Sequence, residues 1–486
     1  MAFRFVTADD QGSIYGVTMD GNLLYYRDLA RDGTANWAFG GASQTIGSGW
    51  GDFKQVLAGG DGVIYAVAPN GDLLFYRDEA RNGTSQWSFG GTGQNIGVGW
   101  GHFSTISSGG SGILYAITPD GSLLYYRDLA RDGTANWAFG GAGQPIGSGW
   151  LVQATLYVAG RHLYVNCWTK IVLRGVNKMA VFDHNDPTGA ISFPEIRKTG
   201  ANSVRIVWAI TQDLKPGGAP TDPAVLDALI TNAAQNHLIP MIELHDATGD
   251  WSRLPELVTY WIRPDIVPIL QKHQRYLLVN IGNEVGDDQV TAAQFLASYT
   301  SAVQQLRTSG IHTPLVIDAP DWGKNLAVLD AMAGALLTAD PDRNLIFSVH
   351  LYWAQSCGAD AAFIQTKLQN SVALKYPLIV GEFSQFGATP CPYDPQASIC
   401  SPGGEIDYHT IIAECQTQQL GWYAWEWGPG NGYIPGSDPP RYDGPCQVMD
   451  MTPNRMFADL KAGWAEEVAI SSPNSIKNTS VIANIF

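Results

Sequence analysis

The pattern of hydrophobic and polar residues divides the chain into two parts. Up to residue 150, short apolar runs such as LLYYRD (Leu23–Asp28) alternate with Asp-Gly or Asn-Gly pairs at 20–21, 70–71 and 120–121. Such pairs between apolar runs are typical of β-hairpins. From residue 171 onward, apolar runs typical of buried strands alternate with helical stretches. We therefore expect an all-β domain over residues 1–150 and an α/β domain over residues 151–486.

The first 150 residues are three tandem repeats of 50 residues. Trp50, Trp100 and Trp150 mark the period, and the segments Leu23–Ala42 and Leu123–Ala142 are identical. A period near 50 residues with about four short strands in each unit is typical of β-propeller blades. The repeats therefore predict propeller-like blades.

The repeated pattern Y-R-D…G-T-x-x-W…I-G-x-G-W resembles the tachylectin-type lectin propellers. The resemblance implies sugar binding, with one candidate site per repeat around Trp37, Trp87 and Trp137. The alternative is that these tryptophans fill the space between blades. Three repeats are fewer than the five with which such propellers close, and an open array exposes strand edges that proteins usually cover. We expect either that two chains pair as a homodimer or that the second domain caps the array.

After residue 170, eight strand–helix units predict a (β/α)8 barrel. A doubly wound sheet is the competing fold, but no predicted strand is followed by a glycine-rich phosphate loop. The predicted helices include Asp222–His237, Thr291–Gly310, Leu326–Ala339 and Glu405–Gln418. The predicted strands are Ile171–Asn177, Ser203–Ala209, Ile239–His245, Tyr276–Glu284, Pro314–Pro320, Leu345–Tyr352, Pro377–Phe383 and Gly421–Trp427.

Polar and aromatic residues concentrate at the carboxyl ends of these strands, where barrel enzymes place their chemistry. Two strands end in a glutamate, Glu284 and Glu382, as two-carboxylate glycoside hydrolysis requires. A single glutamate at such a place can equally be a structural ion-pair residue, but the number of polar ends favours a catalytic site. The other candidate residues are Arg205, His245, Asn283, Trp322, His350, Tyr352, Trp353 and Trp427.

Each candidate can be given a chemical role. We expect Arg205 and Tyr352 to keep Glu382 ionised and to lower its pKa. Glu284 would then be the proton donor with the higher pKa, and Asn283 can donate to a sugar 2-hydroxyl. The histidines His245 and His350 either orient catalytic groups or are structural. Stacking platforms are sought among Trp322, Trp353 and Trp427, one of which can belong to the core.

Seven motifs occur in the order that resembles glycoside hydrolase family 5, most closely its bacterial endo-β-1,4-mannanase branch. The resemblance implies a retaining mechanism, with Glu284 as acid/base and Glu382 as nucleophile about 5 Å apart. By motif matching it also implies supporting roles for Arg205, His245, Asn283, His350, Tyr352 and Trp427. The motifs are R-I-V-W, E-L-H-D-A-T-G, V-N-I-G-N-E, V-I-D-A-P-D-W-G, F-S-V-H-L-Y, G-E-F and G-W-Y-A-W-E-W.

The sequence departs from this branch where substrate subsites are expected. K-M-A-V-F-D-H (Lys178–His184) replaces a histidine- and tryptophan-containing segment, S-Q-F follows Glu382, and Glu426 stands where a small residue is common. The loops between Cys391 and Cys446 also look enlarged. We therefore expect an endo-glycosidase acting on β-mannan or glucomannan, with a β-1,4-glucanase (cellulase) as the first alternative. A lectin-like protein with an inactive barrel is the second.

Composition narrows the remaining possibilities. The net charge of −16 argues against a nucleic-acid partner. No H-E-x-x-H or H-x-H pattern supports a catalytic metal, and we expect no cofactor.

The six cysteines, all beyond residue 166, favour disulfides and an oxidising compartment. No apolar run reaches membrane-spanning length. The chain shows no signal peptide, so we expect a secreted protein whose export signal has been removed.

Overall fold

The computed structural model describes residues 3–118, 121–150, 155–165, 169–210, 221–386, 404–432, 434, 441 and 445–486. The chain divides into two compact units. One comprises Met1–Ala154 with Asn166–Thr169, and the other comprises Thr155–Val165 with Lys170–Phe486. Among the described residues, no helix is both long and apolar enough to cross a bilayer.

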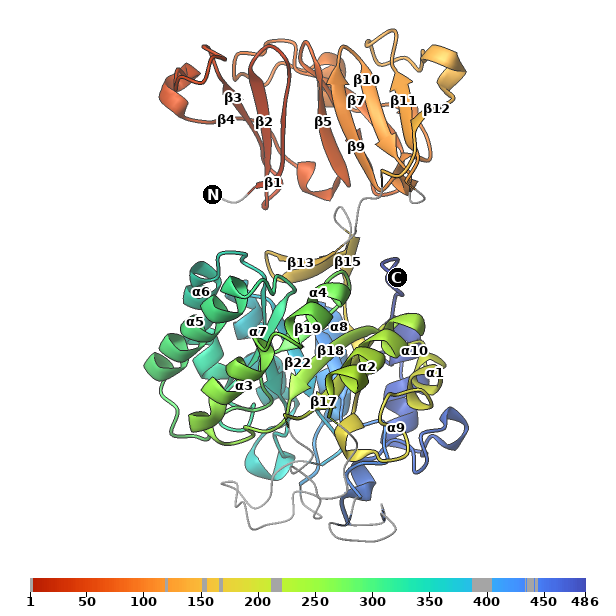
Figure 1. Cartoon of the computed structure of the whole chain (residues 1–486). Coiled ribbons are helices and arrows are strands. Elements are labelled where there is room, and N and C mark those ends of the chain that lie inside the picture. Colours follow the sequence, from red (N-terminus) through yellow and green to blue (C-terminus); the bar gives the residue numbers. More distant parts are fainter. Residues whose placement is uncertain are drawn as a thin grey trace. The chain divides into compact units, whose positions relative to one another are not determined.

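The first unit contains three four-stranded antiparallel sheets, one from each sequence repeat (Figure 1). In each sheet the strands lie in chain order. The first sheet contains β1 (Phe3–Ala8), β2 (Ser13–Thr18), β3 (Leu23–Arg27) and β4 (Gln44–Gly47); the second contains β5 (Gln55–Gly60), β6 (Val63–Val67), β7 (Leu73–Arg77) and β8 (Gln94–Gly97); the third contains β9 (Thr105–Gly110), β10 (Ile113–Ile117), β11 (Leu123–Arg127) and β12 (Gln144–Gly147).

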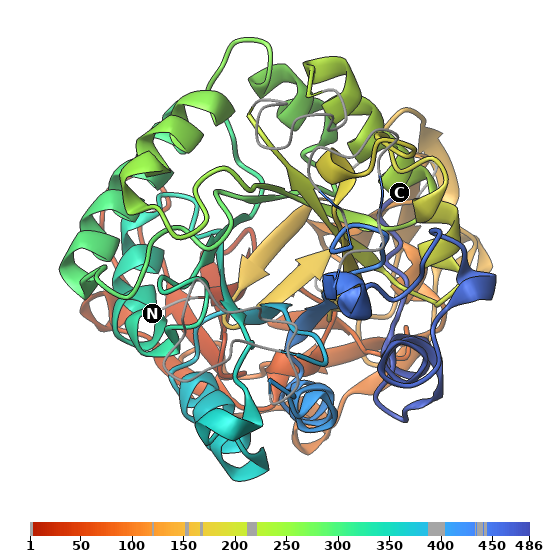
Figure 2. The same ribbon diagram turned by 90° about the horizontal axis from the view of Figure 1, so that it is seen from below.

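The second unit contains a closed barrel of eight parallel strands, as predicted, surrounded by helices (Figure 2). A small antiparallel sheet of β13 (Leu156–Ala159), β14 (His162–Val165) and β15 (Thr169–Ile171) precedes the barrel in the chain. The barrel strands are β16 (Arg174–Lys178), β17 (Ser203–Trp208), β18 (Ile239–Leu244), β19 (Leu278–Asn280), β20 (Leu315–Asp318), β21 (Leu345–His350), β22 (Leu378–Glu382) and β23 (Gly421–Ala424).

Several barrel helices begin at residues that cap their free amide groups. The Asp222 side chain accepts from the Val225 amide at the start of α2, and Thr291 forms a capping box with Gln294 at the start of α5. The helices are α1 (Ser192–Arg197), α2 (Pro223–Gln235), α3 (Leu254–Trp261), α4 (Val267–His273), α5 (Ala292–Thr308), α6 (Leu326–Ala339), α7 (Ala361–Ala373), α8 (Tyr408–Gln418), α9 (Trp464–Glu466) and α10 (Ile476–Thr479).

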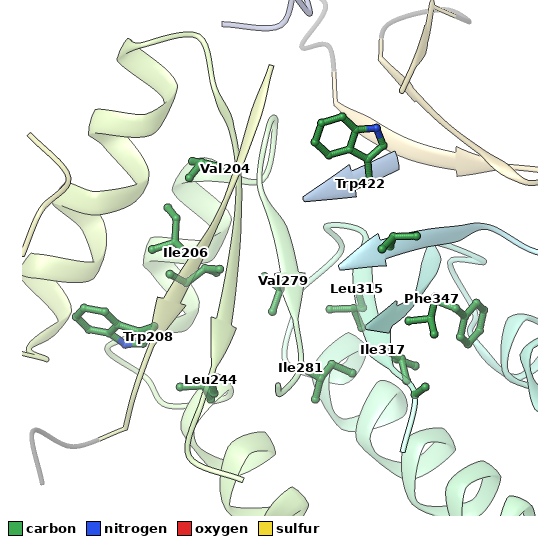
Figure 3. Packing of buried hydrophobic residues seen from close by; sticks show 14 of the residues in the cluster. Val204, Ile206, Trp208, Leu244, Val279, Ile281, Leu315, Ile317, Phe347 and Trp422 are labelled. Atoms are coloured by element: carbon green, nitrogen blue, oxygen red, sulfur yellow. The ribbon is translucent and has the colours of Figure 1, made fainter. Parts of the chain in front are cut away.

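The main core lies between the barrel strands and the helices. Successive side chains of a strand point to opposite faces, so Val204, Ile206 and Trp208 of β17 share one face and are completely buried (Figure 3). They pack in the same cluster as Leu229 of α2. Arg205 between them therefore points to the other face, into the barrel. The alternation that builds the core thus also brings a buried arginine into the barrel interior.

The cysteines that the structure describes differ in state. Cys357 and Cys446 are disulfide-bonded, whereas Cys415 on α8 is a buried free thiol. Burial raises the pKa of the Cys415 thiol to about 12, so it is unreactive at neutral pH. The remaining cysteines, Cys167, Cys391 and Cys400, and most of the loop region between Cys391 and Cys446 lie outside the described residues.

Candidate active site

The two glutamates meet at the carboxyl ends of the barrel strands. Glu382 is the last residue of β22, and Glu284 follows β19 by four residues. One carboxylate oxygen from each, together with a ring nitrogen of His350, lies within 4.8 Å of the others. Glu284 adopts a left-handed backbone conformation with φ of 45°, which non-glycine residues adopt mainly where the surroundings enforce it. The geometry therefore brings the two carboxyl groups close to each other.

Both oxygens of Glu382 are held by neighbouring donors. Nη1 of Arg205 donates to Oε1 at 2.7 Å, and the Tyr352 hydroxyl donates to Oε2 at 2.8 Å. Burial and the nearby Glu382 raise the pKa of Tyr352 well above its usual range, so this hydroxyl keeps its proton. Such charge-assisted hydrogen bonds favour the carboxylate form.

The predicted direction of the Glu382 pKa shift was wrong. Burial in the barrel raises the pKa of this carboxyl, and this effect exceeds the opposing effect of the positive charges on His350 and Arg205. The negative charge of Glu284 raises it further. The sequence indicated the charged partners but not the complete loss of solvent. Arg205 and His350 thus limit the rise in the pKa of Glu382 but do not lower this pKa below its usual value.

Arg205 joins several strands into one hydrogen-bond network. Its guanidinium is fully buried and also donates to amide or carboxylate oxygens of four residues on other strands or strand ends. These acceptors are Asn177 at 3.0 Å, Asn280 at 2.9 Å, Asn283 at 2.7 Å and Asp318 at 3.3 Å. A planar guanidinium offers five donors in a fixed fork, which suits such a buried centre.

His350 connects the two glutamates. Its Nδ1 lies 2.7 Å from Oε1 of Glu284 and 3.6 Å from Oε1 of Glu382. Burial acts to lower the pKa of His350, but the negative charges of Glu382 and Asp318 raise it to about 9. The ring is therefore protonated at neutral pH and places a positive charge beside both carboxyl groups. The Glu284 backbone amide also donates to Asp318, at 3.2 Å.

His245 and Asn283 are also brought to this site. Nδ1 of His245 lies 2.9 Å from Oε1 of Glu243, and although burial lowers the pKa of His245, the charge of Glu243 raises it overall. Because Arg205 can only donate, its contact fixes the amide oxygen of Asn283 inward. The Asn283 nitrogen then donates to Thr248 at 3.0 Å. The buried residues Glu243 and Arg205 thus orient His245 and Asn283, respectively.

One of the three candidate stacking tryptophans could belong to the core, and this one is Trp427. Trp427 is 0% exposed, belongs to the main core, and donates its ring nitrogen to the Arg455 carbonyl at 2.8 Å. It therefore cannot serve as a stacking platform. Trp425, two residues earlier, is 7% exposed and packs in a smaller buried cluster, but its ring lies parallel to that of His245 with 6.1 Å between ring centroids, which places it beside the site. Trp322 and Trp353 are half-buried, as accessible platforms would be.

A second group of buried charges borders the site where the sequence departs from the mannanase branch. Lys178 and Asp183 are fully buried and form an ion pair at 2.6 Å. Glu426 is also fully buried and accepts from the Met179 amide at 3.0 Å. Burial and the charge of Asp450 raise the pKa of Glu426 to about 8. The sequence marks the segment Lys178–His184 and Glu426 as unusual, but it does not show that the Glu426 carboxylate binds the Met179 amide of this segment.

Three residues at the site were missed from the sequence: Glu243, Asn280 and Trp425. Asn280 and Glu243 interrupt otherwise apolar strand sequences, LLVN and MIEL, and this interruption was the available signal. A polar residue inside a buried strand needs hydrogen-bond partners, which here are Arg205 and His245.

The tryptophans of the repeats have a packing role. The ring nitrogens of Trp87 and Trp137 donate to the carbonyls of Ile46 and Ile96 in the preceding repeat, at 2.9 and 2.8 Å. Trp87 also packs against Trp50, with 5.7 Å between ring centroids. Trp37, the equivalent tryptophan of the first repeat, is exposed.

Family models match both parts of the chain. The family model "Cellulase (glycosyl hydrolase family 5)" matches residues 169–431, and the model "Tachylectin" matches residues 1–157. A barrel with paired carboxyls and this match define a glycoside hydrolase. The chain belongs to glycosyl hydrolase family 5, and it carries a tachylectin region before the catalytic barrel.

Individual relatives lie in the mannanase branch. The chain is 29% identical to a mannan endo-1,4-beta-mannosidase of Cellvibrio japonicus over 68% of this chain and 70% of the relative. It is 29% identical to that of Streptomyces lividans over 65% and 73%. Among solved structures, the beta-mannanase from Thermomonospora fusca matches with a TM-score of 0.56 and 29% identity, over 68% of this chain and 99% of the other.

Proposed function

We propose that this chain is a retaining endo-β-1,4-mannanase with Glu382 as nucleophile and Glu284 as acid/base. The supporting observation is the approach of the two carboxylates, whose oxygens come within 4.8 Å. Retaining glycosidases hold their carboxyl groups about 5–5.5 Å apart, whereas inverting enzymes need about 6.5–9.5 Å to admit a water molecule.

The reaction would proceed by two displacements. In the first, a Glu382 oxygen bonds to the anomeric carbon while Glu284 gives its proton to the leaving glycosidic oxygen. In the second, Glu284 takes a proton from water, whose oxygen bonds to the anomeric carbon and releases Glu382. Each step inverts the anomeric centre, so the product keeps the configuration of the substrate.

The surrounding residues support these steps. Arg205 and Tyr352 hold the Glu382 oxygens for attack, and His350 places its charge next to Glu284. With its oxygen bound to Arg205, Asn283 can turn its nitrogen from Thr248 to a sugar 2-hydroxyl. A bond of this kind accelerates the reaction if it strengthens in the transition state.

Mannan is the proposed substrate because the relatives and solved structures described above carry mannanase names. One solved relative, from Thermomonospora fusca, is described as a mannohexaose complex, with a TM-score of 0.55. A β-1,4-glucanase is the second candidate, because the buried Lys178–Asp183 pair and Glu426 replace the segment expected in the mannanase branch.

Reducing-end release from soluble β-mannan, glucomannan and carboxymethyl cellulose tests the substrate. We expect release from mannan and glucomannan and none from the cellulose derivative. Glu382→Ala should abolish it, whereas Glu79→Ala, which removes an exposed glutamate of the repeats, should not. Release from the cellulose derivative alone would replace mannan by glucan, and release from none would favour the lectin-like alternative with an inactive barrel.

We further propose that the three sheets of the first unit are propeller blades that bind a sugar and that two chains complete the propeller. Tachylectin similarity and the matching sheet order of the repeats support this proposal. Retention of the chain on immobilised sugars, with and without residues 1–150, tests the binding role.

Secretion is also proposed, since Cys357 and Cys446 are disulfide-bonded and a polysaccharide substrate lies outside the cell.

A further inference from the structure

Neighbouring repeats pack through one recurring interface. Six positions of each repeat contribute to it: in the first repeat they are Tyr15, Val17, Leu23, Tyr25, Ile46 and Trp50, all buried against the second. The second repeat contributes Val56 and Ala58 from its first strand. The same six positions, together with Ile106 at the place of Val56, recur 50 residues later between the second and third repeats.

The two ends of the array expose the two halves of this interface. At the start, Val6 is 63% exposed, whereas its equivalents Val56 and Ile106 are 4% exposed. At the end, Ile146 and Trp150 are each 53% exposed, whereas Ile46 is 1% and Trp50 is 5% exposed. The other four positions of the third repeat are only half-buried. We call the first surface the leading face (Val6, Asp28, Trp37) and the second the trailing face (Tyr115, Ile146, Trp150).

The polar contacts of the interface also lack one partner at each end. The Tyr15 hydroxyl donates to Oδ2 of Asp78 at 3.4 Å, and the Tyr65 hydroxyl donates to Asp128 at 2.9 Å. Tyr115 is the third tyrosine of this series, but the chain has no fourth repeat to supply an aspartate. Asp28 is the first aspartate of the series, and among the described residues its side chain accepts from the Ala30 and Arg31 amides but from no tyrosine.

We propose that the trailing face of one chain packs against the leading face of a second copy. The Tyr115 hydroxyl then donates to Asp28 of the partner subunit, and the carbonyl of Ile146 accepts from Trp37 of the partner subunit. This repeats the bonds that Trp87 and Trp137 make to Ile46 and Ile96. The partner is a second copy because the residues of the leading face are the equivalents of those that cover the same positions between consecutive repeats of this chain.

The number of copies follows from the number of repeats. A head-to-tail contact forms a ring when the rotation closes and a filament when it does not. Propellers contain about 4–8 blades, so two chains with three repeats each fall within this range, whereas three chains do not. The ring then contains two identical contacts and leaves neither the leading nor the trailing face exposed. This inference rests on the proposed blades but not on the proposed substrate.

Sedimentation equilibrium of the full chain tests the inference. One copy has a mass of 52.5 kDa, so we expect twice this mass for the wild type. Val6→Arg and Ile146→Arg each place a charge on one face and should each give the mass of one copy. Val98→Arg, at a 77% exposed position of the middle repeat, is the matched control and should keep the doubled mass.

Mixing the two arginine variants distinguishes a head-to-tail contact from contacts between identical faces. Val6→Arg keeps its trailing face and Ile146→Arg keeps its leading face, so the mixture should again form two-copy species through one intact contact. A wild type with the mass of one copy, or a Val6→Arg variant that still doubles, would overturn the proposal. Mannan hydrolysis is measured in parallel and should be unchanged, which keeps this test separate from that of the substrate.

Discussion

The Tyr352 hydroxyl offers a test of how the site sustains an ionised Glu382. Tyr352→Phe removes one oxygen, which lies 2.8 Å from Oε2 of Glu382, and leaves the ring in place. A hydrogen bond to a charged group contributes about 1.5–3 kcal/mol. Because this bond favours the carboxylate, its loss should raise the pKa of Glu382 by roughly 1–2 units, at about 1.4 kcal/mol per unit.

The assay is kcat/KM against pH on a soluble manno-oligosaccharide. The acidic limb reports the group that must lose its proton in the free enzyme, so it should move to higher pH in Tyr352→Phe by roughly 1–2 units. Tyr423→Phe is the matched control, because the buried Tyr423 hydroxyl pairs with Ser203 at 2.6 Å rather than with a carboxylate. An acidic limb that stays in place or moves to lower pH would refute the reasoning.

Four further substitutions test other parts of the barrel. Glu284→Gln should reduce hydrolysis of mannan by roughly 10²–10⁴-fold but spare activated aryl mannosides in the first step, which stopped-flow release of the aryl group measures. Trp425 and Trp427 are both buried, so Trp425→Ala and Trp427→Ala should each lower the unfolding free energy of the barrel by about 3–5 kcal/mol in denaturant titrations. Only Trp425→Ala removes a ring beside His245 and should also raise KM. Because the folded-state pKa of Glu426 is raised from 4.5 to about 8, its contribution to stability is present below pH 4.5 and lost as pH rises through 8, at most roughly 5 kcal/mol. Glu426→Gln should therefore flatten the fall in stability between these pH values, and an unchanged slope would contradict this assignment.

The barrel could be predicted because its strands are recognisable runs of apolar residues. The eight predicted ranges contain or overlap the eight observed strands, although β19 is shorter than Tyr276–Glu284. Strand order follows from right-handed strand–helix connections, so the polar strand ends had to meet at one end of the barrel.

The details that escaped prediction depend on tertiary contacts. Strand β23 ends at Ala424, so the two-residue alternation no longer fixes which way Trp425 and Trp427 point. The Glu382 pKa depends on how fully the carboxyl is buried, which the sequence does not show. The packing role of Trp87 is equally non-local, since its bond partner Ile46 lies in another repeat.

The most direct test of the central claim is the stereochemistry of the first product. Proton NMR during the earliest phase of mannohexaose hydrolysis separates the α and β signals of the new reducing end before they equilibrate. Carboxylates whose oxygens come within 4.8 Å predict that the β anomer appears first, as retention requires. Initial formation of the α anomer would show inversion and would contradict the assignment of Glu382 as nucleophile.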